Sequence, residues 1–463
     1  VDNHKRGDFA PDVLRSGDRG RSWRLISGDL PERGSAHTIT EDPVDPDLLF
    51  VGTENGVYVT RDGGGHWMPL DSGLPTIAVR DLEIQAREQD LVVGTFGRGI
   101  YILDDYSPLR VSGEELDDTA ATLFPIRDAL QYIPGDKWGG RRNSHHGNGW
   151  WQADNPPYGA LITYYLRDGY RTLAKQRRED EREREKAGED TPYPDWERLR
   201  AEDDEEAPAV LLTVRDAGGT VVRRLPVPAA RGLHRVAWDL RYRHPGKAAA
   251  EDEAGKDGPP KGLLATPGVY SAELAARVGG ELESIAPPRQ FVVSALPQSP
   301  EHSDDPAARL AFQQRSARLL NAVEAAGERL GALEEQLSLL DIALRDAPAA
   351  EEALRQALRQ LQARRRELLR SLEGDRSLQR RNASAPVSIR ARARRVAFMG
   401  WGSRAAPGAQ QREQYVIAER QFEALMPALR ELLADFEGLA ARATALGAPW
   451  SPGRLPAWPP AAP

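Results

Sequence analysis

An eight-residue motif occurs twice near the start of this 463-residue chain, and no other feature constrains the fold as strongly. Both copies have the pattern Ser/Thr-x-Asp-x-Gly-x-x-Trp, and their aspartates are 44 residues apart. That interval is about the length of one four-stranded propeller blade, so it predicts a repeated β unit. The motif residues are Ser16, Asp18, Gly20 and Trp23 in the first copy and Thr60, Asp62, Gly64 and Trp67 in the second.

The chemistry of the motif predicts a hairpin turn. A carboxylate such as that of Asp18 can accept hydrogen bonds from nearby turn amides, and a glycine such as Gly20 permits a positive φ. The tryptophan can then cover the turn by packing against the sheet. We therefore interpret the eight motif residues as structural.

A second repeat has nearly the same period. Val-Gly-Thr followed by a glycine turn occurs at residues 51–53 and again at 93–95, 42 residues later. Each copy predicts a short strand, a turn and another strand. A third copy of the motif decays at residues 103–106, which lack glycine and tryptophan. We therefore expect residues 1–110 to hold terminal β-propeller blades.

Residues 159–297 contain strand-like runs separated by glycine and proline, a pattern typical of an immunoglobulin-like β-sandwich. Residues 167–206 interrupt them with charges of both signs at helical spacing, which predicts a solvated helical insertion. The expected strands are 159–166, 209–214, 220–227, 233–240, 269–274 and 290–293.

Residues 305–447 have the leucine pattern of an antiparallel three-helix bundle. The first helix is expected to begin at Asp305, an N-cap residue that is followed by proline. Apolar seams over 354–372 and 418–446 predict the second and third helices. Residues 448–463 form a proline-rich tail.

The linker at residues 111–158 contains the segment richest in reactive side chains. Its tryptophans could stack on sugar rings while neighbouring polar groups reach the hydroxyls. Alternatively, they fill the seam between propeller and sandwich. The adjacent His145 and His146 would point to opposite sides of an extended chain and have no acidic neighbour, so we expect no metal. The candidate ligand-binding residues are Trp138, Arg141, Asn143, Trp150 and Trp151.

Composition argues against several classes of protein. The chain has 62 Lys and Arg against 70 Asp and Glu, a net charge of −8, which offers no overall basic surface to nucleic acid. It has no cysteine, so disulfides and thiolate chemistry are excluded. No apolar run is long enough to span a membrane. Phosphate-binding glycine loops and serine nucleophile elbows are absent, and we expect no cofactor.

The two motifs resemble the Asp-box, or bacterial neuraminidase repeat. Stretches such as 52–58, 94–99 and 238–241 resemble the end of bacterial sortilin-type propeller proteins, which are often labelled glycosyl hydrolases. The resemblance covers nearly the whole chain. It implies a large secreted or periplasmic protein, with upstream propeller blades as partners of this C-terminal part. The first residue is valine, so any targeting signal is expected upstream.

Three functions remain open on these observations. We favour a non-catalytic scaffold and binding region that takes a glycan or protein partner. The first alternative is part of a glycoside hydrolase, which needs two carboxylates roughly 5–9.5 Å apart. Glu54 is the one catalytic candidate, and further carboxylates would lie mostly upstream. The second alternative is a sortilin-like peptide-binding receptor without turnover.

Overall fold

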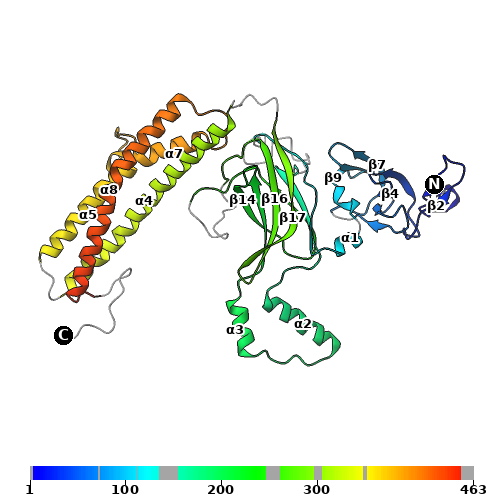
Figure 1. The fold of residues 1–463 in the computed structure, drawn as a ribbon, viewed down its shortest axis with the longest axis horizontal. Coiled ribbons are helices and arrows are strands. Elements are labelled where there is room, and N and C mark those ends of the chain that lie inside the picture. The colour runs from blue at the N-terminus through cyan, green and yellow to red at the C-terminus, as the bar shows by residue number, and fades with distance from the viewer. Residues whose placement is uncertain are drawn as a thin grey trace.

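The protein combines several β-sheets with a C-terminal helical region. The computed structural model describes residues 4–70, 73–111, 113–134, 155–246, 261–296, 305–347 and 352–449. The N-terminal sheets, the central sheets and the helical region follow one another along the long axis of the molecule (Figure 1). These groups of elements thus occur in the same order along the chain and along that axis.

The N-terminal sheets are antiparallel and follow the order of the sequence. The strands β3 to β6 form one four-stranded sheet, and β7 to β9 form a three-stranded sheet that packs against it. A two-stranded ribbon, β1–β2, precedes both. The strands are β1 (Leu14–Arg15), β2 (Arg24–Leu25), β3 (Ala36–Glu41), β4 (Leu49–Thr53), β5 (Gly56–Thr60), β6 (Met68–Pro69), β7 (Val79–Gln85), β8 (Asp90–Thr95) and β9 (Ile100–Leu103).

Strand β4 is buried on both faces, which explains its continuous apolar sequence. On one face, Phe50 packs in a cluster with residues of β7 and β8, among them Leu82. On the other face, Val51 packs with Ile26 and Trp67. The four-stranded sheet is thus the middle layer of a stack.

A buried ionic contact joins the two larger sheets. Asp42, at the end of β3, is 2% exposed, and Arg110 donates to both of its carboxylate oxygens at 2.8 Å. The Tyr106 hydroxyl donates to the same carboxylate at 2.5 Å. Both donors lie beyond β9, in or beside the short 3-10 helix Ser107–Arg110. The end of the second sheet is therefore fixed to the first.

Two facing sheets enclose the central core. One has the order β10-β12-β15 and the other β11-β17-β16-β13-β14, in which only the β11–β17 pair is parallel. Trp238 is completely buried between them, with Tyr270 and Phe291 against it. The strands are β10 (Ala121–Leu123), β11 (Ala129–Gln131), β12 (Ala160–Leu166), β13 (Ala209–Asp216), β14 (Val221–Val227), β15 (Gly232–Trp238), β16 (Gly268–Val278) and β17 (Glu281–Ala295).

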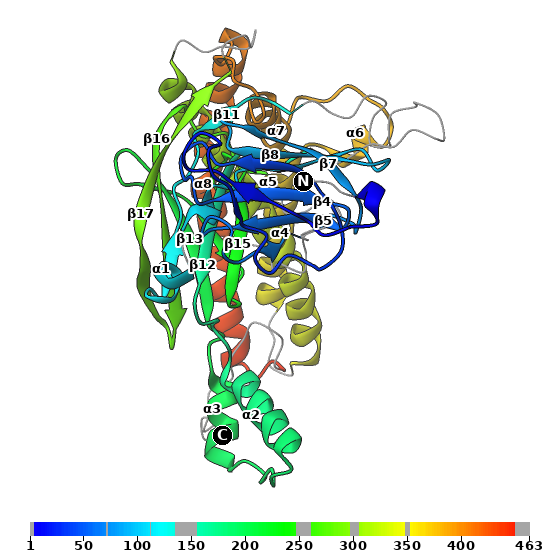
Figure 2. The same ribbon diagram turned by 90° about the vertical axis from the view of Figure 1, so that its right-hand side faces the viewer.

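The charged interruption forms two helices, α2 (Leu173–Ala187) and α3 (Trp196–Asp204), as the mixed charge pattern predicts. They project beyond the sheets (Figure 2). Thr172 caps α2, and Arg177 pairs with Glu181 of the same helix and with Glu202 of α3. A preceding short helix, α1 (Gly113–Asp117), leads into β10.

The helical region contains the three expected long helices, α4 (Pro306–Asp346), α5 (Glu352–Glu373) and α8 (Ala409–Ala445). The Asp305 side chain caps α4 by accepting from the Ala308 amide. Because α5 is shorter, α7 (Ile389–Met399) packs on α4 and α8 where α5 has ended. The small helix α6 (Arg376–Gln379) lies between α5 and α7 in the sequence.

The sequence-based strand limits were incomplete in the central sheets. The two runs expected at 269–274 and 290–293 are parts of a single long hairpin, β16–β17, which turns at Gly279 and Gly280 with positive φ at both. The three-residue strands β10 and β11 were missed because so short a segment carries no periodicity. Immunoglobulin-like topology is not established by this arrangement.

The Asp42 contact yields a stability prediction. Arg110→Ala leaves a buried carboxylate without its cation and should cost about 3 kcal/mol of the free energy of unfolding of the N-terminal sheets. Arg15→Ala is the control, because the Arg15–Asp47 pair is largely exposed and should contribute less than about 1 kcal/mol. Hydrogen exchange at the β4 and β8 amides measures both. Equal losses of stability in the two variants would contradict a stabilising role for the buried Asp42–Arg110 contact.

The same contact should make the N-terminal sheets sensitive to acid. Burial raises the pKa of Asp42, but hydrogen bonds from Arg110 and Tyr106 outweigh it and hold this pKa below the ordinary value. A lowered folded-state pKa stabilises the fold above the ordinary aspartate pKa of about 3.9. That stability disappears as the pH falls through the folded-state value. Asp42→Asn should flatten this pH dependence in hydrogen exchange.

Candidate functional site

The two motif turns have matching hydrogen bonds. In the first, the Ser16 hydroxyl accepts from the Gly20 amide at 2.7 Å, and Asp18 accepts from the Ser22 amide at 2.8 Å. In the second turn, 44 residues later, the Gly64 amide donates to the Thr60 hydroxyl at 3.1 Å, and the His66 amide donates to the Asp62 carboxylate at 2.9 Å.

The strands beside these turns also repeat. Leu14 pairs with Leu25 in β1–β2, and the residues 44 positions later, Tyr58 and Pro69, pair in β5–β6. The Ile26 amide donates to the Val13 carbonyl at 2.8 Å, and the equivalent bond from Leu70 to Val57 has the same length. The ribbon β1–β2 therefore corresponds to the outer half, β5–β6, of the four-stranded sheet.

The motif carboxylates act as hydrogen-bond acceptors. Hydrogen bonds from the Ser22 backbone and side chain lower the pKa of Asp18 to about 2. Burial raises the pKa of Asp62, but bonds from His66 and Thr60 reverse this and hold it well below its usual range. Both groups remain ionised at neutral pH and are occupied by turn amides, so neither can serve as a general acid.

The two motif tryptophans differ sharply in burial. Trp67 is 5% exposed, its indole nitrogen donates to the Ile26 carbonyl at 2.8 Å, and its amide donates to Asp29 at 2.6 Å. Trp23 is 62% exposed. Trp67 thus packs on residues just after β2, whereas the side chain of Trp23 is largely in solvent. Ile26 and Asp29 were not predicted from the sequence, since neither belongs to the motif.

A groove of about 470 Å³ lies beside the exposed tryptophan. It runs along β3 and the start of β1, on the face of the four-stranded sheet that β1–β2 covers only in part. Ile39, 46% exposed, lies in it. The residues that line the groove include Val13, Leu14, Trp23, His37, Ile39 and Val51.

The catalytic candidate, Glu54, lies exposed in the turn between β4 and β5. The sequence indicates no second carboxylate that would act as its catalytic partner. Within the described residues, no group of three or more His, Asp or Glu side chains could hold a metal ion.

The expected ligand platform, Trp138 to Trp151, falls within residues 135–154, outside the described residues. On either side of it, Tyr132 and Tyr158 meet edge to face with ring centroids 4.9 Å apart. This contact brings together the described residues on either side of that segment.

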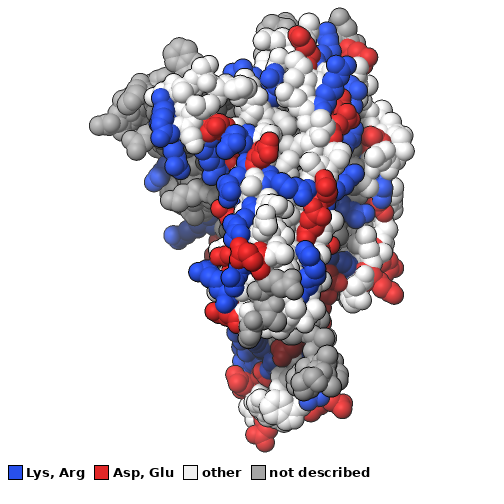
Figure 3. Space-filling view, turned by 90° about the vertical axis from the view of Figure 1, so that its left-hand side faces the viewer, with Lys and Arg blue, Asp and Glu red and all other residues white. Residues whose placement is uncertain are grey.

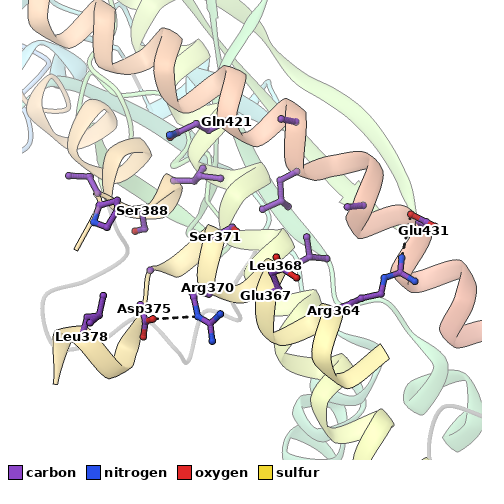
Figure 4. Close-up of a pocket in the computed structure, with 17 residues that line it drawn as sticks. Arg364, Glu367, Leu368, Arg370, Ser371, Asp375, Leu378, Ser388, Gln421 and Glu431 are labelled. Carbon is purple, nitrogen blue, oxygen red and sulfur yellow. Dashed lines mark ion pairs between the residues drawn. The ribbon is translucent and has the colours of Figure 1, made fainter. Parts of the chain in front are cut away.

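A larger groove, of about 830 Å³, lies in the helical region (Figure 4). Its apolar floor includes Leu368 and Leu425, and its rim carries the ion pairs Arg364–Glu431 and Arg370–Asp375. These pairs neutralise the charges at its edge. Lys and Arg also intermingle with Asp and Glu over the face of the molecule that Figure 3 shows. The groove has space for a ligand but no evident chemical selectivity.

Comparison with known proteins gives only distant likeness. No family model and no curated protein matches the chain. Among solved structures, the extracellular domain of a putative one-component system from B. thetaiotaomicron is 13% identical, with a TM-score of 0.18 over 63% of this chain and 29% of that one. The GH74 xyloglucanase from Xanthomonas campestris is 10% identical, with a TM-score of 0.19 over 59% and 44%.

The chain thus spans less than half the length of either of these solved structures. TM-scores of this size do not establish a shared fold, and no functional residue is transferred from either protein.

The unequal tryptophans yield a paired prediction. Trp67→Ala removes a buried indole and should lower the free energy of unfolding of the N-terminal sheets by about 3–5 kcal/mol. Trp23→Ala in the isolated chain should change it by less than about 0.5 kcal/mol, because the side chain is mostly in solvent. Urea titration monitored by hydrogen exchange in β5 measures each. Comparable losses in the two variants would mean that the Trp23 side chain already packs against the protein and would contradict its exposure.

Proposed function

We propose that this chain is a non-catalytic scaffold and binding region whose N-terminal sheets are blades of an incomplete β-propeller. The observation that carries the proposal is the exposed Trp23 beside an open groove, in a turn whose 44-residue repeat buries Trp67. The open face would receive two inner strands from another segment, which the resemblance identifies with upstream blades of a larger protein.

The neighbouring sheets show how such strands would pack. Strand β7 packs against β3 and β4 of the preceding sheet. By the repeat, β3 should in turn face the inner strands of a blade of which β1–β2 forms only the outer half. The groove lies where those inner strands would be, and it exposes Ile39 and Trp23.

The non-catalytic part of the proposal rests on the acceptor role of the motif carboxylates. Asp18 and Asp62 are bound to turn amides, and Glu54 lacks an assigned partner carboxylate. A glycoside hydrolase remains the alternative if its carboxylates belong mostly to other blades. A sortilin-like receptor, which binds peptide without turnover, is compatible with the same open face.

The partner we expect for the completed propeller is a glycan or a protein, in a secreted or periplasmic setting. This setting comes from the resemblance to Asp-box proteins. None of the described helices is long and apolar enough to cross a bilayer.

A hairpin probe tests the open face. A peptide of residues 36–53, the inner hairpin of the intact sheet, should bind the chain and protect Trp23 from acrylamide quenching. The difference between wild type and Trp23→Phe isolates that signal. The substitution Ile39→Asp in the chain, with the peptide unchanged, should weaken binding at least tenfold by placing a charge in the groove. Ile102→Asp, at an exposed isoleucine of β9, is the matched control and should bind normally.

A glycan panel tests the absence of catalysis. We expect no hydrolysis by this chain, and Glu54→Gln should leave any glycan binding unchanged. Turnover by the chain alone that Glu54→Gln abolishes would establish the hydrolase alternative. Failure of the hairpin to bind, with Ile39→Asp and Ile102→Asp behaving alike, would refute the incomplete-blade model.

A further inference from the structure

Three arginines are buried where the central sheets meet the helical region. Arg309 lies in the first turns of α4 and Arg404 between α7 and α8, and they are 3% and 4% exposed. Arg241 follows β15 and is 9% exposed. A buried guanidinium is rare unless a counter-charge accompanies it.

Two of these arginines are close to each other. The Arg309 guanidinium donates to the carbonyl of Ser403, the residue before Arg404, at 3.5 Å. Arg404 reaches across to the central sheets and donates to the Gln131 carbonyl at 3.3 Å. Burial lowers the pKa of Arg309, and the charge of Arg404 lowers it further. The two positive charges thus repel each other across a short separation in a dry environment.

Much of the donor capacity of Arg309 is unused. Its Nε and Nη2 atoms are buried and have no hydrogen-bond partner. None of the ion pairs among the described residues involves Arg309, Arg404 or Arg241, although Arg110 and Arg365 elsewhere in the chain have carboxylates within 4.0 Å. Buried N–H donors and a buried charge without partners destabilise a fold, so an anionic ligand is a natural complement to this arginine.

Neutral polar groups complete the surroundings. The Gln131 Oε1 atom and the Tyr158 hydroxyl are buried without hydrogen-bond partners. Burial raises the pKa of Tyr158, while the Tyr132 backbone and the charges of Arg241 and Arg404 act on it in the opposite direction. This hydroxyl therefore lies within the field of two of the arginines and is neutral at physiological pH.

We propose that Arg309 and Arg404, with Arg241 and Tyr158 beside them, bind an oxyanion at the junction of the central sheets and the helical region. A phosphate, sulfate or carboxylate group matches the forked donors of arginine, which recognise planar or tetrahedral oxyanions. The unpaired Gln131 Oε1 would accept a hydrogen bond from a protonated oxygen or a neighbouring hydroxyl of the ligand. Such a ligand would tie the two regions together.

Binding is tested on the chain as it exists, with inorganic phosphate as the first probe. Calorimetric titration should detect a site, and saturating phosphate should raise the unfolding temperature of the junction by roughly 3 °C or more. Potassium chloride at equal ionic strength should not. Sulfate and glucuronate, tested in the same way, distinguish an inorganic anion from the carboxylate of an acidic sugar.

Variants separate a binding site from a structural role. Arg309→Gln and Arg404→Gln should each weaken phosphate binding at least tenfold. Arg309→Gln should also be at least as stable as wild type without phosphate, because it removes an unpaired buried charge. Arg365→Gln is the matched control: this arginine is equally buried, but it donates to the Leu330 carbonyl and pairs with Glu334. It should keep the full phosphate response.

Arg309→Lys provides a second measurement if the glutamine variants fold poorly, since it keeps the charge but loses the fork and should bind more weakly. The proposal is overturned if none of the three anions binds more tightly than chloride. It is also overturned if Arg309 and Arg404 variants respond to phosphate as Arg365→Gln does. Neither result bears on the incomplete-blade model, which concerns the opposite end of the molecule.

Discussion

A β-sheet that is apolar on both faces must have a neighbour on each side, and this constraint organises the N-terminal part of the protein. Strand β4 has Phe50 on one face and Val51 on the other, and both are fully buried. The three-stranded sheet β7–β9 covers the first face, and the β1–β2 ribbon covers only part of the other. The exposed Trp23 and the groove along β3 follow from that incomplete cover.

The three parts of the molecule are joined in a different way from the sheets within them. Arg235 of β15 donates to the carbonyls of Asp104 and Asp105 at the end of the N-terminal sheets. Trp401 donates to the Lys261 carbonyl between the helical region and the central sheets, at 2.7 Å. Both contacts are hydrogen bonds that a side chain donates to a backbone carbonyl. Charged contacts add to the first junction, where Arg127 pairs with Glu88 at 3.1 Å and with Asp90 at 3.3 Å.

The parts that could be predicted from sequence are those encoded by local spacing. The 44-residue motif interval and the leucine seams each lie within one short stretch, and the turns and long helices appear where they were expected. The β11–β17 pair joins residues 129–131 to 293–295, and no local sequence pattern predicts this pairing. The difference between Trp23 and Trp67 was equally hidden, because identical motif residues differ only in what packs beside them.

The two unsatisfied regions of the molecule call for different chemistry. At the N-terminal sheets the open surface is apolar and bounded by strand edges, so extended backbone with alternating apolar side chains satisfies it. At the junction with the helical region the unsatisfied groups are cationic donors in a dry environment, so an anion would satisfy both their charge and their hydrogen bonds. Because the central sheets separate the two, their ligands should act independently, and stability gained at one should add to stability gained at the other. A scaffold with both features could therefore be completed by further blades at one end and fixed by a charged ligand at the other.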